Sequence, residues 1–271
     1  MALYILIVEG YTDCALIEAI LERNMGFCLY KNKNDMPILF QSLVKSYPSV
    51  TGNLNRTDMP HFYYCKDVNI IVKVAGGESN FSKNVEEVLQ AADLSGTEKE
   101  INKFILFTDS DCKNKWEIEN LLKKRYEERE IYYKIQEKKI AFLGREYEHE
   151  LYVYPNQGFG AVEKVLLAMT EKVYPELSDM SKEVRRKLFE KEFAEFRKSN
   201  WASEAKIQEF YGDKFQFGVI TSALKPDRPV GFAIKDKIVK KEFLKELENV
   251  DEFCRLRHFL NDNILEIDNY K

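Results

Sequence analysis

Residues 3–20 read LYILIVEGYTDCALIEAI, and this stretch decides the fold. Its first six residues are apolar and contain several β-branched side chains, which is typical of a buried strand. Apolar residues then recur at helical spacing from Cys14 to Leu21, which predicts a helix. The periodicity changes between Gly10 and Asp13, so the chain is expected to open with a strand, a turn and a helix.

The alternation of strands and helices continues along the chain. Residues 69–74 (NIIVKV) and 104–107 (FILF) predict two further buried strands. A charged segment with helical spacing covers residues 116–130, and another strand is expected at 139–143 or at 151–154. This order predicts an α/β fold with a mainly parallel sheet that is flanked by helices.

The chain is expected to divide near residue 170. Residues 1–170 contain the predicted α/β domain, with an insertion at about residues 30–66 that has little regular patterning. Residues 171–271 have mostly helical spacing, which predicts a mostly helical C-terminal region. A chain of 271 residues is long enough for one domain with such an appendage.

The composition predicts a cytoplasmic protein without a membrane span. No stretch approaches the roughly 20 continuous apolar residues that a membrane helix needs. The five cysteines form no CxxC pair, which weighs against a disulfide framework and a zinc ribbon and fits a reducing compartment. Because the formal net charge is −4, binding to nucleic acid would need local basic patches or metal ions.

Three acidic residues follow predicted strands. Glu9 comes directly after the first strand, and Asp109 and Asp111 follow the strand at 104–107. Open parallel sheets place their sites at these carboxyl ends, and two residues that are two apart on a continuing strand share a face. Crowded carboxylates repel each other, and a hard divalent cation such as Mg²⁺ compensates for this. The three acids therefore predict metal-assisted phosphodiester chemistry, while helix caps or turns are the alternative for each acid alone.

Two segments resemble the Toprim superfamily, namely LIVEGYTD at 6–13 and FTDSD at 107–111. Members of that superfamily have a Glu and a Gly after the first strand and a DxD motif after a later one. The resemblance covers roughly residues 3–165 and implies a Toprim-like metal-binding domain with a mainly parallel sheet. It further implies that Glu9 is a metal ligand or general acid/base and that Asp109 and Asp111 bind Mg²⁺ or Mn²⁺.

A second resemblance concerns YVYPN at 152–156 and GAVE at 160–163. These segments are similar to an uncharacterised Toprim-related family and to the GxxE element of the overcoming-lysogenization-defect nucleases. The resemblance implies that Glu163 and Asp13 hold a second metal, whereas a helix cap for Asp13 and a first-turn dipole interaction for Glu163 are the alternatives. Those nucleases also use a late lysine to stabilise the transition state, a role for which Lys225 or Lys237 is a candidate.

Together these features predict a nuclease that uses Mg²⁺ or Mn²⁺ to hydrolyse nucleic-acid phosphodiesters. DNA is favoured over RNA as its partner, and the nuclease relatives imply a role in phage defence. One alternative is an RNA-processing Toprim ribonuclease. Another is a non-catalytic Toprim module that binds nucleic acid or a partner ATPase. A primase or recombination mediator of this superfamily would be expected to carry a zinc motif, which these cysteines do not form.

Overall fold

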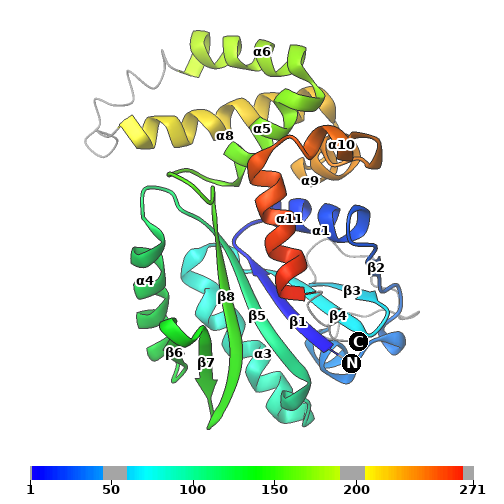
Figure 1. Cartoon of the computed structure of the whole chain (residues 1–271), viewed down its shortest axis with the longest axis vertical. Coiled ribbons are helices and arrows are strands. Elements are labelled where there is room, and N and C mark those ends of the chain that lie inside the picture. Colours follow the sequence, from blue (N-terminus) through cyan, green and yellow to red (C-terminus); the bar gives the residue numbers. More distant parts are fainter. Residues whose placement is uncertain (1, 45–59, 190–204, 265–271) are drawn as a thin grey trace. The chain divides into compact units, whose positions relative to one another are not determined.

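The computed structural model describes residues 2–44, 60–189 and 205–264 (Figure 1). Within these ranges the strands form one eight-stranded sheet with the order β2-β3-β4-β1-β5-β8-β7-β6. The strands are β1 (Ala2–Val8), β2 (Cys28–Leu29), β3 (His61–Cys65), β4 (Val68–Val74), β5 (Ile101–Asp109), β6 (Tyr132–Lys134), β7 (Lys139–Phe142) and β8 (Arg145–Tyr154). The predicted α/β class is therefore confirmed.

The sheet is mixed, so the prediction of a mainly parallel sheet is wrong at its edges. Strand β1 runs parallel to β4 and to β5, and Val8 lies opposite Val74 on one side and Phe107 on the other. By contrast, β2, β3 and β4 pair antiparallel in sequence, as do β6, β7 and β8. Short turns at 66–67 and 143–144 join neighbouring strands of these edges, and such connections produce antiparallel pairs.

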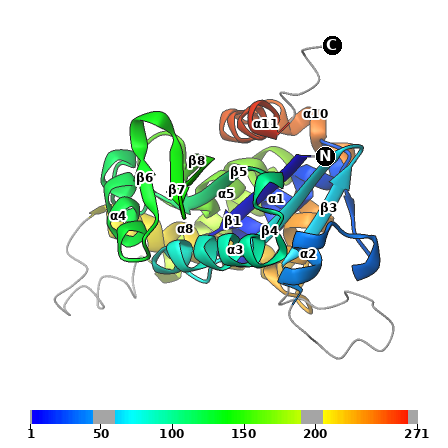
Figure 2. The same cartoon turned by 90° about the horizontal axis from the view of Figure 1, so that it is seen from below.

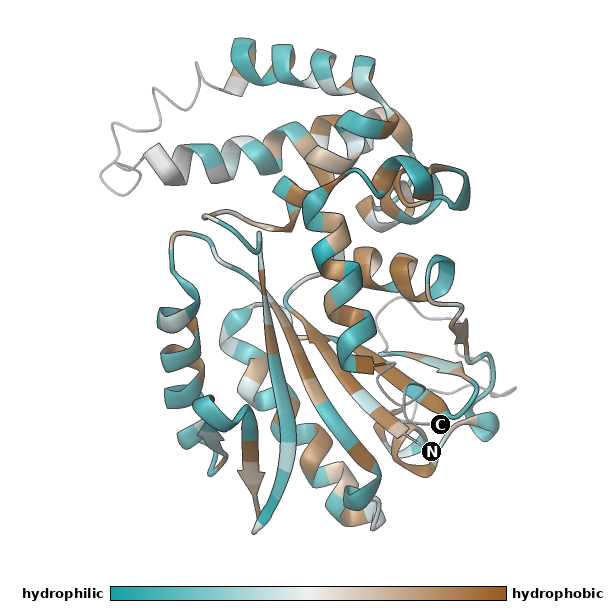
Figure 3. Cartoon of the chain, viewed as in Figure 1, coloured by the Kyte–Doolittle hydropathy of each residue, from teal (hydrophilic) through white to brown (hydrophobic). Residues whose placement is uncertain are grey.

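The core of the sheet is formed by its central strands. All seven residues of β1 are buried, and Figure 3 shows the central strands as the most hydrophobic part of the sheet. Helices α2 (Ile38–Leu43) and α3 (Phe81–Ser95) pack on each other and lie on the same face of the sheet (Figure 2). Helix α3 turns Val85, Val88 and Leu89 inward at the spacing that one face of a helix requires.

The C-terminal part of the described chain is mostly helical. Helices dominate the described residues from 162 onward, which confirms the predicted helical C-terminal region. None of the helices in the described ranges has the length and apolar character needed to cross a membrane. The remaining α-helices are α1 (Tyr11–Arg23), α4 (Lys115–Glu127), α5 (Val162–Val173), α6 (Pro175–Val184), α8 (Ala205–Leu224), α9 (Val230–Ala233), α10 (Leu244–Leu247) and α11 (Asp251–Ile264).

The chain forms two compact units. The sheet unit comprises residues 1–14, 25–108 and 116–152, and the helical unit comprises residues 15–24, 109–115 and 153–271. This division differs from the boundary predicted near residue 170. The insertion predicted at 30–66 contributes α2 and β3 to the sheet unit, and its residues 45–59 lie outside the described part.

Candidate functional site

Glu9 is held at the carboxyl end of β1 by the two strands that flank it. Its backbone N–H donates to the carbonyl of Phe107 (3.1 Å), and its own carbonyl accepts from Gly76 and Gly77 (both 3.1 Å). These glycines have φ values of 73° and 111°, a region that favours glycine, so the turn after β4 is shaped to reach Glu9. The Thr108 hydroxyl donates to the Glu9 carboxylate at 2.7 Å, which orients this side chain.

Asp13 interacts with the backbone at the start of its own helix. It is the third residue of α1, is 3% exposed, and accepts a hydrogen bond from the Gly10 N–H at 3.0 Å. A side chain that reaches back to the N-cap amide is half of a capping box. The contact corresponds to the helix-capping alternative for Asp13, and its role as a metal ligand stays a prediction.

Asp109 and Asp111 are positioned differently from each other. Strand β5 ends at Asp109, so the shared face that a continuing strand would give to Asp109 and Asp111 does not apply. Ser110 is fixed to the neighbouring segment, because its N–H donates to the Tyr154 carbonyl at 2.7 Å and its hydroxyl bonds both the N–H and the carbonyl of Gly160. The Asp111 N–H donates to the Gly160 carbonyl at 2.8 Å, and Asp111 has a φ of 50°. Asp is one of the few residues that adopt this left-handed conformation readily. The direction of the Asp111 side chain is therefore determined by a turn and not by a strand face.

The GAVE segment lies beside these aspartates. The Val162 N–H, at the first turn of α5, donates to Asp109 Oδ1 at 2.8 Å. One unsatisfied amide of the helix terminus thereby receives an acceptor, and the aspartate is fixed in return. Glu163 is the next residue of the same turn and is 9% exposed. The structure therefore brings the predicted residues Asp109 and Glu163 close together.

Lys214 of α8 is the cation at this group of acids. Its Nζ lies 3.2 Å from Glu163 Oε2 and 3.7 Å from Asp109 Oδ2. Burial opposes the charged form of the ammonium, but the attraction of Glu163, Asp109 and Asp111 outweighs it and raises the pKa of Lys214 above its ordinary value. Three carboxylates thus act on one positive charge, and we call Asp109, Asp111, Glu163 and Lys214 the acidic cluster.

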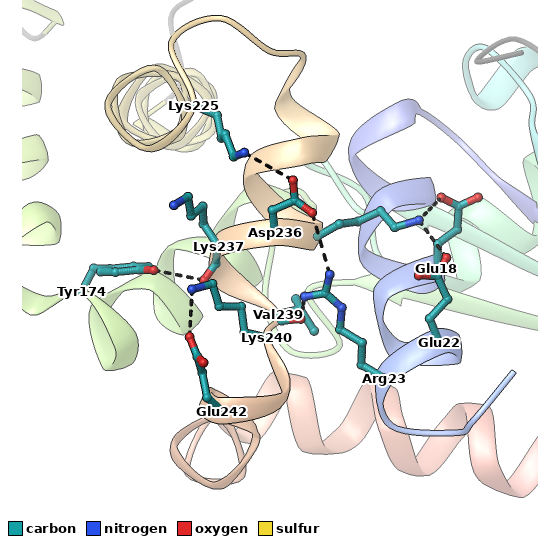
Figure 4. Close-up of polar contacts among 11 residues, drawn as sticks. Glu18, Glu22, Arg23, Tyr174, Lys225, Asp236, Lys237, Val239, Lys240 and Glu242 are labelled. Carbon is teal, nitrogen blue, oxygen red and sulfur yellow. Dashed lines mark hydrogen bonds and ion pairs between the residues drawn. The ribbon is translucent and has the colours of Figure 1, made fainter. Parts of the chain in front are cut away.

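The lysines predicted from the sequence lie elsewhere in the helical unit (Figure 4). Lys225 Nζ is 3.4 Å from Asp236 Oδ2, and the Lys237 carbonyl accepts from the Tyr174 hydroxyl at 3.2 Å. The lysine that contacts the predicted acids is therefore Lys214 rather than Lys225 or Lys237. Sequence reasoning missed it because no local motif separates one lysine from the chain's 41 Lys and Arg residues.

The acidic cluster offers carboxylate oxygens as potential metal ligands. Mg²⁺ and Mn²⁺ prefer carboxylate oxygens, and Asp109, Asp111 and Glu163 offer three such groups. Lys214 contacts two of these carboxylates, Glu163 and Asp109, and Asp111 adds to the negative field that raises the pKa of Lys214. Binding of Mg²⁺ or Mn²⁺ by these residues stays a prediction.

Comparisons with known proteins add a fold and a family. Among solved structures, a hypothetical protein from Pyrococcus horikoshii OT3 is similar to this chain, with 14% sequence identity and a TM-score of 0.52. The likeness covers 96% of this chain and 100% of that protein, and at this identity it shows a shared fold alone. No curated protein matches the chain. A family model matches residues 3–261, so the chain belongs to the family described as "Protein of unknown function (DUF3226)".

Proposed function

We propose that this protein is a metal-dependent hydrolase of nucleic-acid phosphodiesters with a Toprim-type carboxylate site. The acidic cluster is the observation that carries the proposal. Glu163 and Asp109 lie 3.2 Å and 3.7 Å from one lysine ammonium, and Asp111 contributes to the same field. The resemblance of residues 6–13 and 107–111 to Toprim domains supports the same assignment.

Each residue of the proposed site has a separate task. Asp109, Asp111 and Glu163 would hold Mg²⁺ or Mn²⁺, and such an ion polarises a phosphoryl oxygen and lowers the pKa of bound water. The Val162 N–H donates to Asp109 Oδ1, and Asp109 Oδ2 faces the Lys214 ammonium. Lys214 can bind a phosphoryl oxygen and stabilise the charge that develops on it during hydrolysis.

Glu9 is included in the proposed site because of its position in the sequence motif at residues 6–13. Its carboxylate accepts from Thr108, the residue that directly precedes Asp109 in the chain. A carboxylate whose orientation is fixed in this way can serve as a ligand or as a general base for water. Asp13 is left out of the proposed set, because its carboxylate caps α1 through Gly10.

A cleavage assay with matched variants tests the proposal. Purified protein is incubated with plasmid DNA, single-stranded DNA and structured RNA in Mg²⁺, Mn²⁺ or EDTA. We expect metal-dependent cleavage by the wild type and its loss in Asp109→Asn. Asp236→Asn is the control, because this aspartate also pairs with a lysine of the helical unit but lies outside the acidic cluster. Equal cleavage by the wild type and Asp109→Asn would exclude the proposed site.

A further inference from the structure

Two large aromatic side chains of the sheet unit are unusually exposed. Tyr11 is 66% exposed and Trp116 is 70% exposed. Tyr11 begins α1 and lies two residues after Glu9, whereas Trp116 is in the first turn of α4 and lies five residues after Asp111. Because β1 and β5 are parallel neighbours, the segments that carry both aromatic residues leave the sheet at its same edge.

Trp116 does not contribute to the core of its own helix. Helix α4 buries Ile118, Leu122 and Tyr126, which recur at four-residue intervals along one face. Trp116 precedes Ile118 by two positions, which corresponds to about 200° around the helix axis, so Trp116 lies outside the line of these buried residues. Solvent exposure of a tryptophan is uncommon in a folded protein, and its indole face is available for a ligand.

The residues before Trp116 supply positive charge. Lys113 and Lys115 lie between Asp111 and Trp116 in the chain, and Lys115 is exposed. The Lys113 N–H donates to the Ser110 carbonyl at 2.8 Å, which closes a turn directly after the aspartates. A segment with two lysines and an exposed tryptophan combines the groups that bind phosphate and unpaired bases.

We propose that the substrate is a single-stranded nucleic acid and that its unpaired bases stack on Trp116 and Tyr11. This inference rests on the proposed function, since it assigns the substrate class of the proposed hydrolase. Bases in a duplex already stack on one another and cannot offer their faces to a side chain.

Fluorescence of Trp116 gives a test that does not depend on turnover. The chain has two tryptophans, so Trp201→Phe leaves Trp116 as the single indole emitter. This protein is titrated with short oligothymidylate, oligouridylate or duplex DNA, with EDTA or Ca²⁺ present. We expect both single strands to quench the emission and the duplex to leave it nearly unchanged. Equal quenching by the duplex, or no quenching by either single strand, would overturn the inference.

Matched substitutions separate stacking from general surface effects. Trp116→Ala and Tyr11→Ala should each weaken oligothymidylate binding by roughly tenfold, as expected for the loss of one stacked base. Tyr132→Ala is the control, because this tyrosine is 65% exposed in the same unit but lies in β6, after the far end of α4. Unchanged affinity in both variants would refute the stacking role.

The fluorescence titration and the cleavage assay can fail independently of each other. Quenching by single strands in a protein that never cleaves would support the inference and refute the hydrolase. Metal-dependent cleavage without any change in Trp116 emission would leave the hydrolase standing and overturn the inference.

Discussion

Lowering the pH from 7.5 to 5 should destabilise the protein by about 2 kcal/mol through His149 alone. His149 lies in β8 and is completely buried, and its Nε2 is 3.1 Å from the Tyr126 hydroxyl. The Tyr126 and Tyr133 rings pack against it. Burial opposes the charged imidazolium and lowers the pKa of His149 from 6.5 to about 3.

The direction of the effect follows from proton linkage. Between pH 6.5 and 3 the unfolded chain binds a proton at His149 that the folded chain does not, so stability falls as the pH falls. At pH 5 the unfolded histidine is almost fully protonated and the folded one is almost fully neutral. With these two pKa values the free energy of unfolding decreases by about 2 kcal/mol relative to pH 7.5, and the full effect develops only as the pH approaches 3.

Urea unfolding of the wild type and His149→Phe, followed by circular dichroism at several pH values, measures this contribution. The phenylalanine retains an aromatic ring against Tyr126 and Tyr133 but cannot titrate. At pH 7.5 the variant is expected to be less stable, because Tyr126 loses its hydrogen-bond partner, so the informative quantity is the change in stability with pH. A wild type and variant that lose the same free energy between pH 7.5 and 5 would refute the assigned burial of a neutral His149.

Three further predictions concern residues at or beside the candidate site. Lys214→Met removes the ammonium that three carboxylates attract. Mg²⁺ should therefore bind roughly tenfold more tightly in isothermal titration calorimetry, while cleavage should fall. Weaker metal binding would contradict this electrostatic role. Gly160→Ala should lower the free energy of unfolding by about 1–3 kcal/mol in a thermal unfolding scan. Gly160 has a φ of 144°, and a Cβ there would lie 3.3 Å from the Lys164 side chain. An unchanged transition would refute this backbone strain. Asp13→Ala should cost about 1 kcal/mol of stability by removing the cap on α1 and should leave metal affinity unchanged, whereas a large loss of affinity would make Asp13 a ligand.

The central strands could be predicted from the sequence because their signal is local. The run at residues 3–8 is apolar without interruption, as a strand buried on both faces requires, and β1 has this burial. The antiparallel edges carried no comparable signal. Their turns place Lys66 and Leu143 at positive φ, which these residue types rarely adopt, and Gly144 is the one glycine in the two turns.

The candidate site was predictable to a similar extent. Glu9 and Asp109 could be identified because each lies at the carboxyl end of a central strand, where the order of elements alone predicts a site. The position of Asp111 depends on its hydrogen bond with Gly160, and that of Lys214 depends on how α8 packs in the helical unit. Such long-range contacts leave no trace in the local spacing of residues.

Metal binding by the acidic cluster is the most direct test of the account. Electron paramagnetic resonance of Mn²⁺ distinguishes free from bound ion and requires neither a substrate nor turnover. We expect the wild type and Asp236→Asn to bind Mn²⁺ with equal affinity and Asp109→Asn and Asp111→Asn to bind it much more weakly. Wild-type affinity in the Asp109→Asn and Asp111→Asn variants, or no binding by the wild type, would contradict a metal centre at these residues.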